Sequence, residues 1–203
     1  GGAPRDGLTI GLLQRGILLV GLSRLPQVQF DIGKFNWLGS LNTEIGVAAV
    51  WHTTGINSWE DLLTRTTITS MANSQGGFGA RALNAILGTK FKQVCCYGSD
   101  SNQNLALERG EVEGACGLGW DSLLSGKPEW IEGKKVNIFV QMGAEPLDEL
   151  KGSPFLYDIL QSQDDRPMID FLVGRMYLGR PFVGPPGMSP GVTKALRDAF
   201  MAT

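Results

Sequence analysis

The apolar residues of this chain fall into short runs that polar and glycine-containing turns separate. The run Ile45–Trp51 is apolar at successive positions, which is typical of a parallel strand buried on both faces. The run Thr66–Thr69 is β-branched, and this also favours a strand. In chain order, the predicted strands are Leu8–Leu13, Phe35–Leu41, Ile45–Trp51, Thr66–Thr69, Phe91–Tyr97, Val112–Cys116 and Val136–Met142.

Helices are predicted between these strands from their start and stop residues. Ser58 is a candidate N-cap, with Asp61 in the place of the usual glutamate of a capping box. Gly88 and Gly110 each follow an apolar helical pattern and are expected to end it. The predicted helices begin at Ser58 and cover Ala80–Leu87, Gln103–Arg109, Phe155–Leu160, Met168–Tyr177 and the segment from Ser189-Pro190 to Phe200. This alternation predicts an α/β fold with a largely parallel sheet, whose ligands would bind at the carboxyl ends of the strands.

Composition narrows the class of protein. The 203 residues are 42% hydrophobic and 19% charged, which excludes a disordered tail. A net charge of −2 and the lack of a basic run argue against a partner nucleic acid or anionic membrane. No apolar stretch is long enough for a membrane helix, so we expect no direct membrane insertion. The 28 glycines have no period and are expected to mark tight turns.

Histidine and cysteine counts limit the chemistry further. The single histidine, His52, excludes a His-rich zinc site and has no evident catalytic partner. Cys95, Cys96 and Cys116 match no zinc spacing. Their odd number fits either reduced thiols or one disulfide with one free thiol. Because Cys95 and Cys96 lie in a predicted strand, we favour buried thiols. Without a nucleophile–base pair or a metal cluster, we predict a binding protein that has no catalytic residues, metal or cofactor.

The sharpest local feature is the loop Ser74-Gln75-Gly76-Gly77-Phe78-Gly79 between a predicted strand and a helix. Its glycines would let a carboxylate or phosphate approach the unpaired N–H groups at the helix start. Two other interpretations stay open. The loop could be an ordinary turn, or Gly77–Ala82 could be a dinucleotide fingerprint with Asp100 about twenty residues further on. No phosphate-binding loop of the ATP type is present.

Two more segments follow predicted strands and are expected to line the same crevice. Tyr97-Gly98-Ser99 offers an aromatic face, a hydroxyl group and backbone donors to a carboxylate. Trp120-Asp121 could form another wall, although a tryptophan at this place is as often a core residue.

Several blocks of the sequence together resemble the Bug/TctC family, the solute-binding proteins of tripartite tricarboxylate transporters. The most specific block is Leu105–Gly114, which reads Leu-Ala-Leu-Glu-Arg-Gly-Glu-Val-Glu-Gly. The other blocks are Pro4–Thr9, Phe35–Ser40, Leu87–Val94, Arg180–Val183 with Pro185–Gly187, and Leu196–Phe200.

The resemblance implies a type II periplasmic-binding fold with two lobes, parallel or mixed sheets and crossovers near Ile45–Trp51 and Leu178–Gly184. Residues 1–47 with 181–203 would form the first lobe and residues 48–180 the second. A small dicarboxylate, tricarboxylate or aromatic carboxylate would sit between the lobes, in the periplasm, for delivery to the permease subunits of a membrane transporter.

Carried over by position, the resemblance also implies the ligand contacts. Asn73, Ser74, Gln75, Gly76, Gly77 and Phe78 match the family's loop for a ligand carboxylate, and Tyr97 and Gly98 match its strand-end Tyr-x-Gly. Gln14 and Ser40 would face the cleft from the first lobe.

The sequence also departs from the family pattern. The family's first strand and Pro-Gly-Gly loop have no counterpart before Ala3, and its last helices have none after Phe200. We therefore expect a chain truncated at both ends, with an incomplete first lobe. Phe78 in place of a small residue would narrow the cleft. The alternatives are a ligand-sensing regulatory domain of the same fold and a dinucleotide-dependent enzyme.

Overall fold

The computed structural model describes residues 2–14, 16–22, 26, 28–71 and 77–202. Contacts divide the chain into two compact units. Unit 1 comprises Gly1–Thr43 with Arg175–Thr203, and unit 2 comprises Glu44–Gly174. The predicted lobe boundaries differ from these limits by a few residues, and the identity of the units with the two lobes of a binding protein stays a prediction.

Unit 2 is built on a five-stranded sheet with the order β5-β4-β6-β3-β7. These strands are β3 (Gly46–Trp51), β4 (Thr67–Met71), β5 (Phe91–Cys95), β6 (Gly114–Gly119) and β7 (Val136–Met142). Strand β4 is parallel to β5 and β6, whereas β3 is antiparallel to β6 and β7. The sheet is therefore mixed.

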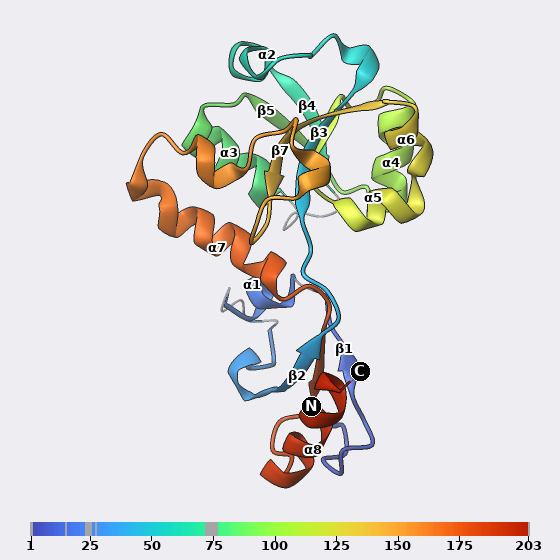
Figure 1. The fold of residues 1–203 in the computed structure, drawn as a ribbon, viewed down its shortest axis with the longest axis vertical. Coiled ribbons are helices and arrows are strands. Elements are labelled where there is room, and N and C mark those ends of the chain that lie inside the picture. Colours follow the sequence, from blue (N-terminus) through green and yellow to red (C-terminus); the bar gives the residue numbers. More distant parts are fainter. Residues whose placement is uncertain (1, 15, 23–25, 27, 72–76, 203) are drawn as a thin grey trace. The chain divides into compact units, whose positions relative to one another are not determined.

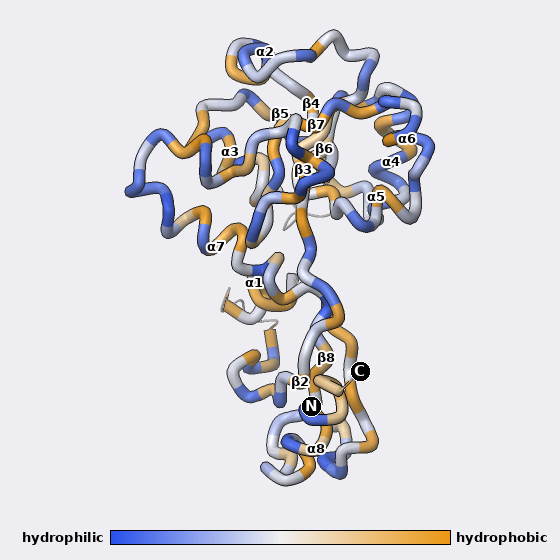
Figure 2. Tube along the Cα trace, viewed as in Figure 1, coloured by the Kyte–Doolittle hydropathy of each residue, from blue (hydrophilic) through white to orange (hydrophobic). Residues whose placement is uncertain are grey.

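Helices cover both faces of this sheet (Figure 1). One face packs on α3 (Phe78–Leu87) and α7 (Arg166–Tyr177), and the other packs on α4 (Asp100–Glu108), α5 (Trp120–Gly126) and α6 (Pro128–Glu132). Strand β3 serves both layers, because Ala48 and Val50 belong to the first core and Val47 and Ala49 to the second. In Figure 2 the apolar positions of unit 2 gather in and around this sheet.

The apolar pattern predicted the position of β3 but not its direction. Predicting a parallel strand at Ile45–Trp51 was wrong, since both neighbours run antiparallel to β3. The run is apolar at every position because helices bury both sheet faces, and this burial does not depend on strand direction.

Helix α2 (Trp59–Thr64) confirms the predicted capping box. The Ser58 hydroxyl oxygen accepts a hydrogen bond from the Asp61 amide at 3.2 Å. In return, the Asp61 carboxylate accepts one from the Ser58 amide at 3.0 Å. These two bonds satisfy two of the amides that a helix start leaves without partners. The Asp61 carboxylate accepts hydrogen bonds from the Asn57 and Ser58 amides, and these bonds lower its pKa.

Unit 1 holds a three-stranded antiparallel sheet with the order β1-β8-β2. Its elements are β1 (Gly11–Leu12), α1 (Ile17–Leu22), β2 (Asn36–Ser40), β8 (Pro181–Gly184) and α8 (Pro190–Met201). Helix α8 begins as predicted, with Ser189 as N-cap and Pro190 in its first turn. It packs on β2, where a Cβ atom at Gly39 would overlap the Phe200 ring.

Two predicted elements are shorter or different. The strand predicted at Leu8–Leu13 is limited to β1, because only Gly11 and Leu12 pair with β8. The helix predicted at Phe155–Leu160 is the 3-10 helix Leu156–Ile159, because Phe155 instead forms a bridge to Gln141 of β7.

Candidate functional site

The candidate site lies at one edge of the unit 2 sheet, where the parallel strands β4, β5 and β6 all end. Met71 at the end of β4 pairs with Cys95 at the end of β5, and the end of β6 leads directly into α5. Helices α3, α4 and α5 begin at this edge, so three positive dipole ends point to it. Of the predicted site segments, Gly77-Phe78, Tyr97–Ser99 and Trp120-Asp121 all lie here; Asn73, Ser74, Gln75 and Gly76 lie outside the described residues.

The start of α3 is buried, and no side chain among the described residues caps it. Gly77 is its N-cap residue and accepts the Arg81 amide, but no described side chain caps the first turn. Gly77, Gly79 and Ala80 are buried. A Cβ atom at Gly77 would lie 2.6 Å from Met71 Sδ and 2.7 Å from Gln93 Oε1. The amides of a helix start need acceptors, so this turn is suited to an anion.

Phe78 contributes an apolar wall rather than a polar contact. It is half-buried, packs against the first core, and meets Phe171 of α7 edge to face at a centroid distance of 5.7 Å. Phe171 is 43% exposed, so this aromatic pair lies at the border of the core.

The segment Tyr97–Ser99 is held from both ends. The amides of Cys96 and Tyr97 donate to the Met71 carbonyl at 3.1 and 3.3 Å, and Asn102 Nδ2 donates to the Tyr97 carbonyl at 2.7 Å. The Ser99 hydroxyl oxygen accepts the Asn102 amide as the N-cap of α4. Gly98 has φ +80°, in the left-handed region that favours glycine.

Trp120 and Asp121 are less suited to an anion. Trp120 is only 4% exposed, belongs to the second core, and donates its indole N–H to Glu149 at 3.1 Å. It is thus placed as the core residue that the sequence left open. Asp121 is an exposed carboxylate in the first turn of α5, where its charge suits the helix dipole.

Gln14 and Ser40 belong to unit 1. Gln14 is exposed, and its carbonyl accepts the Ile17 amide. Ser40 donates its hydroxyl to the Asn42 carbonyl at 2.9 Å and accepts the Arg180 amide at 3.1 Å. The Ser40 hydroxyl therefore links the segment at Asn42 to the segment at Arg180.

Sequence reasoning missed two features. Cys95 and Cys96 are not buried thiols: they form a disulfide and both are exposed, because β5 ends at Cys95 and the chain turns there. Arg175 of α7 is 9% exposed, and its Nε has no partner among the described residues; burial lowers the pKa of this guanidinium. In the sequence, the signal that could have revealed this residue is a charged arginine placed between Val173-Gly174 and Met176.

Other kinds of site find little support in the part of the chain that the structure describes. It holds no group of three or more His, Cys, Asp or Glu residues that could bind a metal, and no helix there is long and apolar enough to cross a membrane. In the dinucleotide alternative, Asp100 would bind the ribose. In the structure it is the first residue of α4, and its carboxylate accepts a hydrogen bond from Gln103 Nε2 of the same helix at 3.2 Å.

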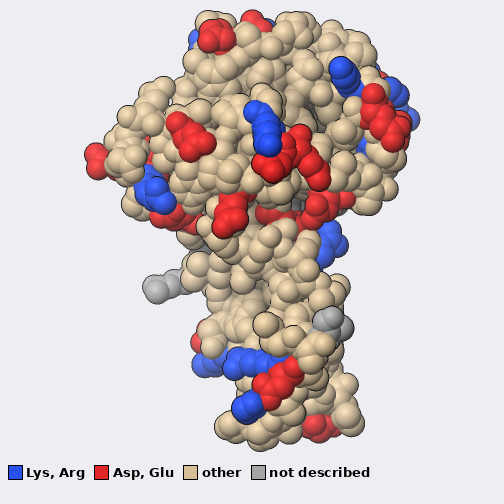
Figure 3. Space-filling model, in the orientation of Figure 1, with Lys and Arg blue, Asp and Glu red and all other residues tan. Residues whose placement is uncertain are grey.

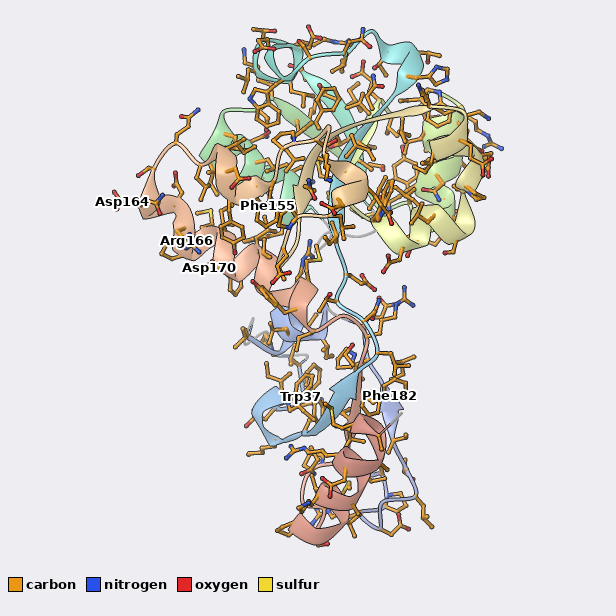
Figure 4. All side chains as sticks on the ribbon, viewed as in Figure 1. Trp37, Phe155, Asp164, Arg166, Asp170 and Phe182 are labelled. Atoms are coloured by element: carbon orange, nitrogen blue, oxygen red, sulfur yellow. A yellow bond between two sulfur atoms is a disulfide. The ribbon has the colours of Figure 1, made fainter. Side chains whose placement is uncertain are left out.

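In the view of Figure 3, basic and acidic side chains are both exposed. Two hollows of unit 1 are open to solvent. One of about 340 Å³ is lined by residues of α8, and one of about 470 Å³ by Phe30, Phe35 and their neighbours. Figure 4 labels Trp37 and Phe182, which lie on the adjacent strands β2 and β8 of the same unit.

No family model matches the sequence, and no curated protein matches it. Several solved structures match the chain. A TctC solute-binding protein from Polaromonas matches with a TM-score of 0.69 at 15% identity, over 98% of this chain and 65% of that chain. The chain has the fold of periplasmic solute-binding proteins.

Two further structures with this fold carry ligands. The Rpa4515 protein of R. palustris with adipate has a TM-score of 0.69 at 17% identity, over 100% of this chain and 66% of that chain. MatC from Rhodopseudomonas palustris with bound malate has a TM-score of 0.63 at 14% identity, over 98% and 66%. The chain thus spans about two thirds of the length of these proteins. The matches confirm the predicted fold class and the structural resemblance to TctC and Bug proteins.

Proposed function

We propose that this chain is part of an extracytoplasmic solute-binding protein that captures a small carboxylate and delivers it to a membrane permease. The carboxylate would accept hydrogen bonds from the first turn of α3 and from the amides of Gly98 and Ser99, since the Tyr97 amide already donates to the Met71 carbonyl. Two structures that share the fold hold adipate and malate, which supports a carboxylate as the ligand.

The observation that carries this proposal is the buried start of α3 without a described side-chain cap. By contrast, α4 at the same sheet edge is capped by Ser99. Buried helix amides without acceptors are costly, and an anionic ligand supplies acceptors where the dipole is positive. Because the contacts are backbone groups, they fix the charge of the ligand but not the shape of its remainder.

Calorimetric titration of the whole chain with adipate and malate tests the proposal. We expect binding of at least one, and a higher melting temperature with it, because a ligand that binds the folded state stabilises it by about 2.7 kcal/mol at a hundredfold excess over Kd. The diamide of adipate has the same length without charge and should not bind. Binding of NAD in place of every carboxylate would contradict the proposal and favour the dinucleotide enzyme.

A matched pair of glycine variants locates the site. Gly98 and Gly88 both have positive φ, at +80° and +74°, and at both a Cβ atom would meet open space. Gly98→Ala and Gly88→Ala should therefore each lower the free energy of unfolding by about 1 kcal/mol. Only Gly98 lies at the proposed site, since Gly88 ends α3 at the other edge of the sheet. We expect Gly98→Ala alone to weaken adipate or malate binding; an equal loss in Gly88→Ala would refute this placement.

A further inference from the structure

The Cys95–Cys96 disulfide stands at the carboxyl end of β5, directly before the proposed ligand segment Tyr97–Ser99. Both cysteines are exposed, so small thiols and disulfides in solution can reach their sulfur atoms. Cys116, the remaining cysteine, is a free thiol of β6. Burial raises its pKa to about 12, so it holds little thiolate with which to attack the disulfide.

The backbone at this disulfide is unusual. Cys96 has φ +86°, a conformation that residues other than glycine rarely adopt and that costs free energy. A disulfide between neighbouring residues closes a ring that contains their own peptide bond, so it restricts the backbone at this position. Without the bond, the Cys96 backbone is free to return to negative φ.

The conformation of Cys96 sets the direction of the amides that follow. The amides of Cys96 and Tyr97 share one acceptor, the Met71 carbonyl at the end of β4. On the other side, Asn102 and the Ser99 cap fix the segment to α4. A change of φ at Cys96 would therefore rotate the Tyr97 amide away from Met71, between two points that are themselves held.

We propose that the Cys95–Cys96 disulfide is a redox-sensitive lock that holds Tyr97–Ser99 in its ligand-binding conformation, and that its reduction loosens this segment. The ligand part of this inference rests on the proposed function; the conformational part does not. An oxidising compartment, where disulfides persist, would keep the lock closed.

The reducing step needs a small dithiol. One thiolate of the dithiol attacks either protein sulfur, forms a mixed disulfide and releases the other cysteine as a thiolate, which takes up a proton. The second thiol of the reagent then displaces the remaining protein sulfur. The chain gains two electrons and two protons, and the reagent leaves as a cyclic disulfide. A small-molecule disulfide reverses the process as the oxidant.

The first measurement is the mass of the native chain after iodoacetamide, with and without prior treatment by dithiothreitol. We expect no rapid labelling of the untreated chain and two labels, at Cys95 and Cys96, after reduction. Rapid labelling of these two residues without a reductant would show that the disulfide does not form, which overturns the proposal.

The second measurement is hydrogen exchange of residues 94–102 in the oxidised and reduced chain. We expect roughly tenfold faster exchange after reduction, since the left-handed conformation of Cys96 is no longer enforced. The variant C95S/C96S should exchange like the reduced chain in both conditions, and the matched control C116S, which keeps the disulfide, like the parent. Equal exchange in both redox states would overturn the lock.

The third measurement is adipate affinity in both states, expected to fall on the order of tenfold on reduction. If reduction changes hydrogen exchange but not adipate affinity, the disulfide does not control ligand binding and this part of the proposal is overturned. If adipate and malate bind neither form while exchange still responds, the proposed function fails and only the conformational part of the lock stands.

Discussion

Unit 2 buries its apolar side chains on both faces of a sheet, whereas unit 1 leaves many of its own on the surface. Val47, Leu83 and Leu172 of unit 2 are completely buried. In unit 1, Leu8 is 89% exposed and Leu12 is 58% exposed, and with Ile10 they share one face of an extended segment by their period of two. Apolar side chains thus build a core in unit 2 and leave an exposed apolar face in unit 1.

This difference in burial indicates which unit contributes most of the stability. Two core clusters hold the unit 2 sheet between helix layers, and α7 is further fixed by polar contacts. Tyr157 donates its hydroxyl to Asp170 at 2.8 Å, and Arg166 lies over the Tyr157 ring at 5.0 Å; Figure 4 shows Arg166 and Asp170 on the outer part of this helix. We therefore expect unit 2 to carry most of the free energy of unfolding.

The largest expected effect comes from a pair of leucine truncations. Leu83→Ala removes a fully buried side chain of α3 and should lower the free energy of unfolding of unit 2 by about 3 kcal/mol, because the core cannot close the cavity. Leu12→Ala removes an exposed side chain of β1 and should change it by less than about 0.5 kcal/mol.

Urea unfolding followed by tryptophan fluorescence measures both variants. Trp37 is the tryptophan of unit 1, so a Trp37→Phe background restricts the signal to unit 2. A loss for Leu12→Ala as large as that for Leu83→Ala would break the comparison, since it would mean that the apolar face of β1 is covered in solution.

The sequence carried more information on unit 2 than on unit 1 for the same reason. Strand β7 begins and ends at the predicted residues, Val136 and Met142, and its last four residues, which include Phe139 and Val140, are all buried. In the predicted strand Leu8–Leu13 only two residues pair with β8, and its alternating apolar residues Leu8, Ile10 and Leu12 are exposed.

Features that depend on contacts distant in sequence could not be predicted. The antiparallel direction of β3 follows from its pairing with β6 and β7, which lie far along the chain. The common sheet edge of the Gly77 loop and the Tyr97–Ser99 segment followed from strand order. The two helices that start there were predicted to begin later, at Ala80 and Gln103, than they do in the structure, at Phe78 and Asp100. The disulfide of Cys95 and Cys96 was not, since it depends on β5 ending between them.

Two glycines that are closely packed against another element give a second, smaller contrast. A Cβ atom at Gly114 in β6 would lie 2.6 Å from the Ala49 carbonyl oxygen, which is held within the central sheet. At Gly39 in β2 the obstacle is the half-buried Phe200 ring near the end of α8. Overpacking is costly where the neighbour cannot move. We therefore expect Gly114→Ala to cost about 2 kcal/mol and Gly39→Ala about 1 kcal/mol, measured by urea unfolding. The reverse order would show unit 1 to be the more rigidly packed.

Acidic pH should reduce the difference in stability between unit 2 and unit 1. Among the described residues, the carboxyl groups with a lowered pKa, Asp61 and Glu108, both lie in unit 2. The Lys127 ammonium donates to Glu108 at 2.7 Å and holds the pKa of this carboxyl below its usual value, and the indole of the buried Trp130 donates to the same oxygen at 3.0 Å.

A group whose pKa is lower in the folded state stabilises that state above its unfolded pKa, about 4.3 for glutamate, and this contribution is lost as the pH falls through the folded value. Unit 2 should therefore lose stability on acidification below about pH 4.3. Glu108→Gln should reduce this acid-induced decrease in the free energy of unfolding by less than about 1 kcal/mol, because the Glu108–Lys127 pair is partly exposed to solvent. The matched control is Glu129→Gln, whose carboxylate lies 3.7 Å from the same ammonium and is more exposed. Urea unfolding at pH 7 and pH 3.5 compares the three chains, and an equal reduction by both variants would mean that general charge, rather than the buried indole partner, makes Glu108 sensitive to acid.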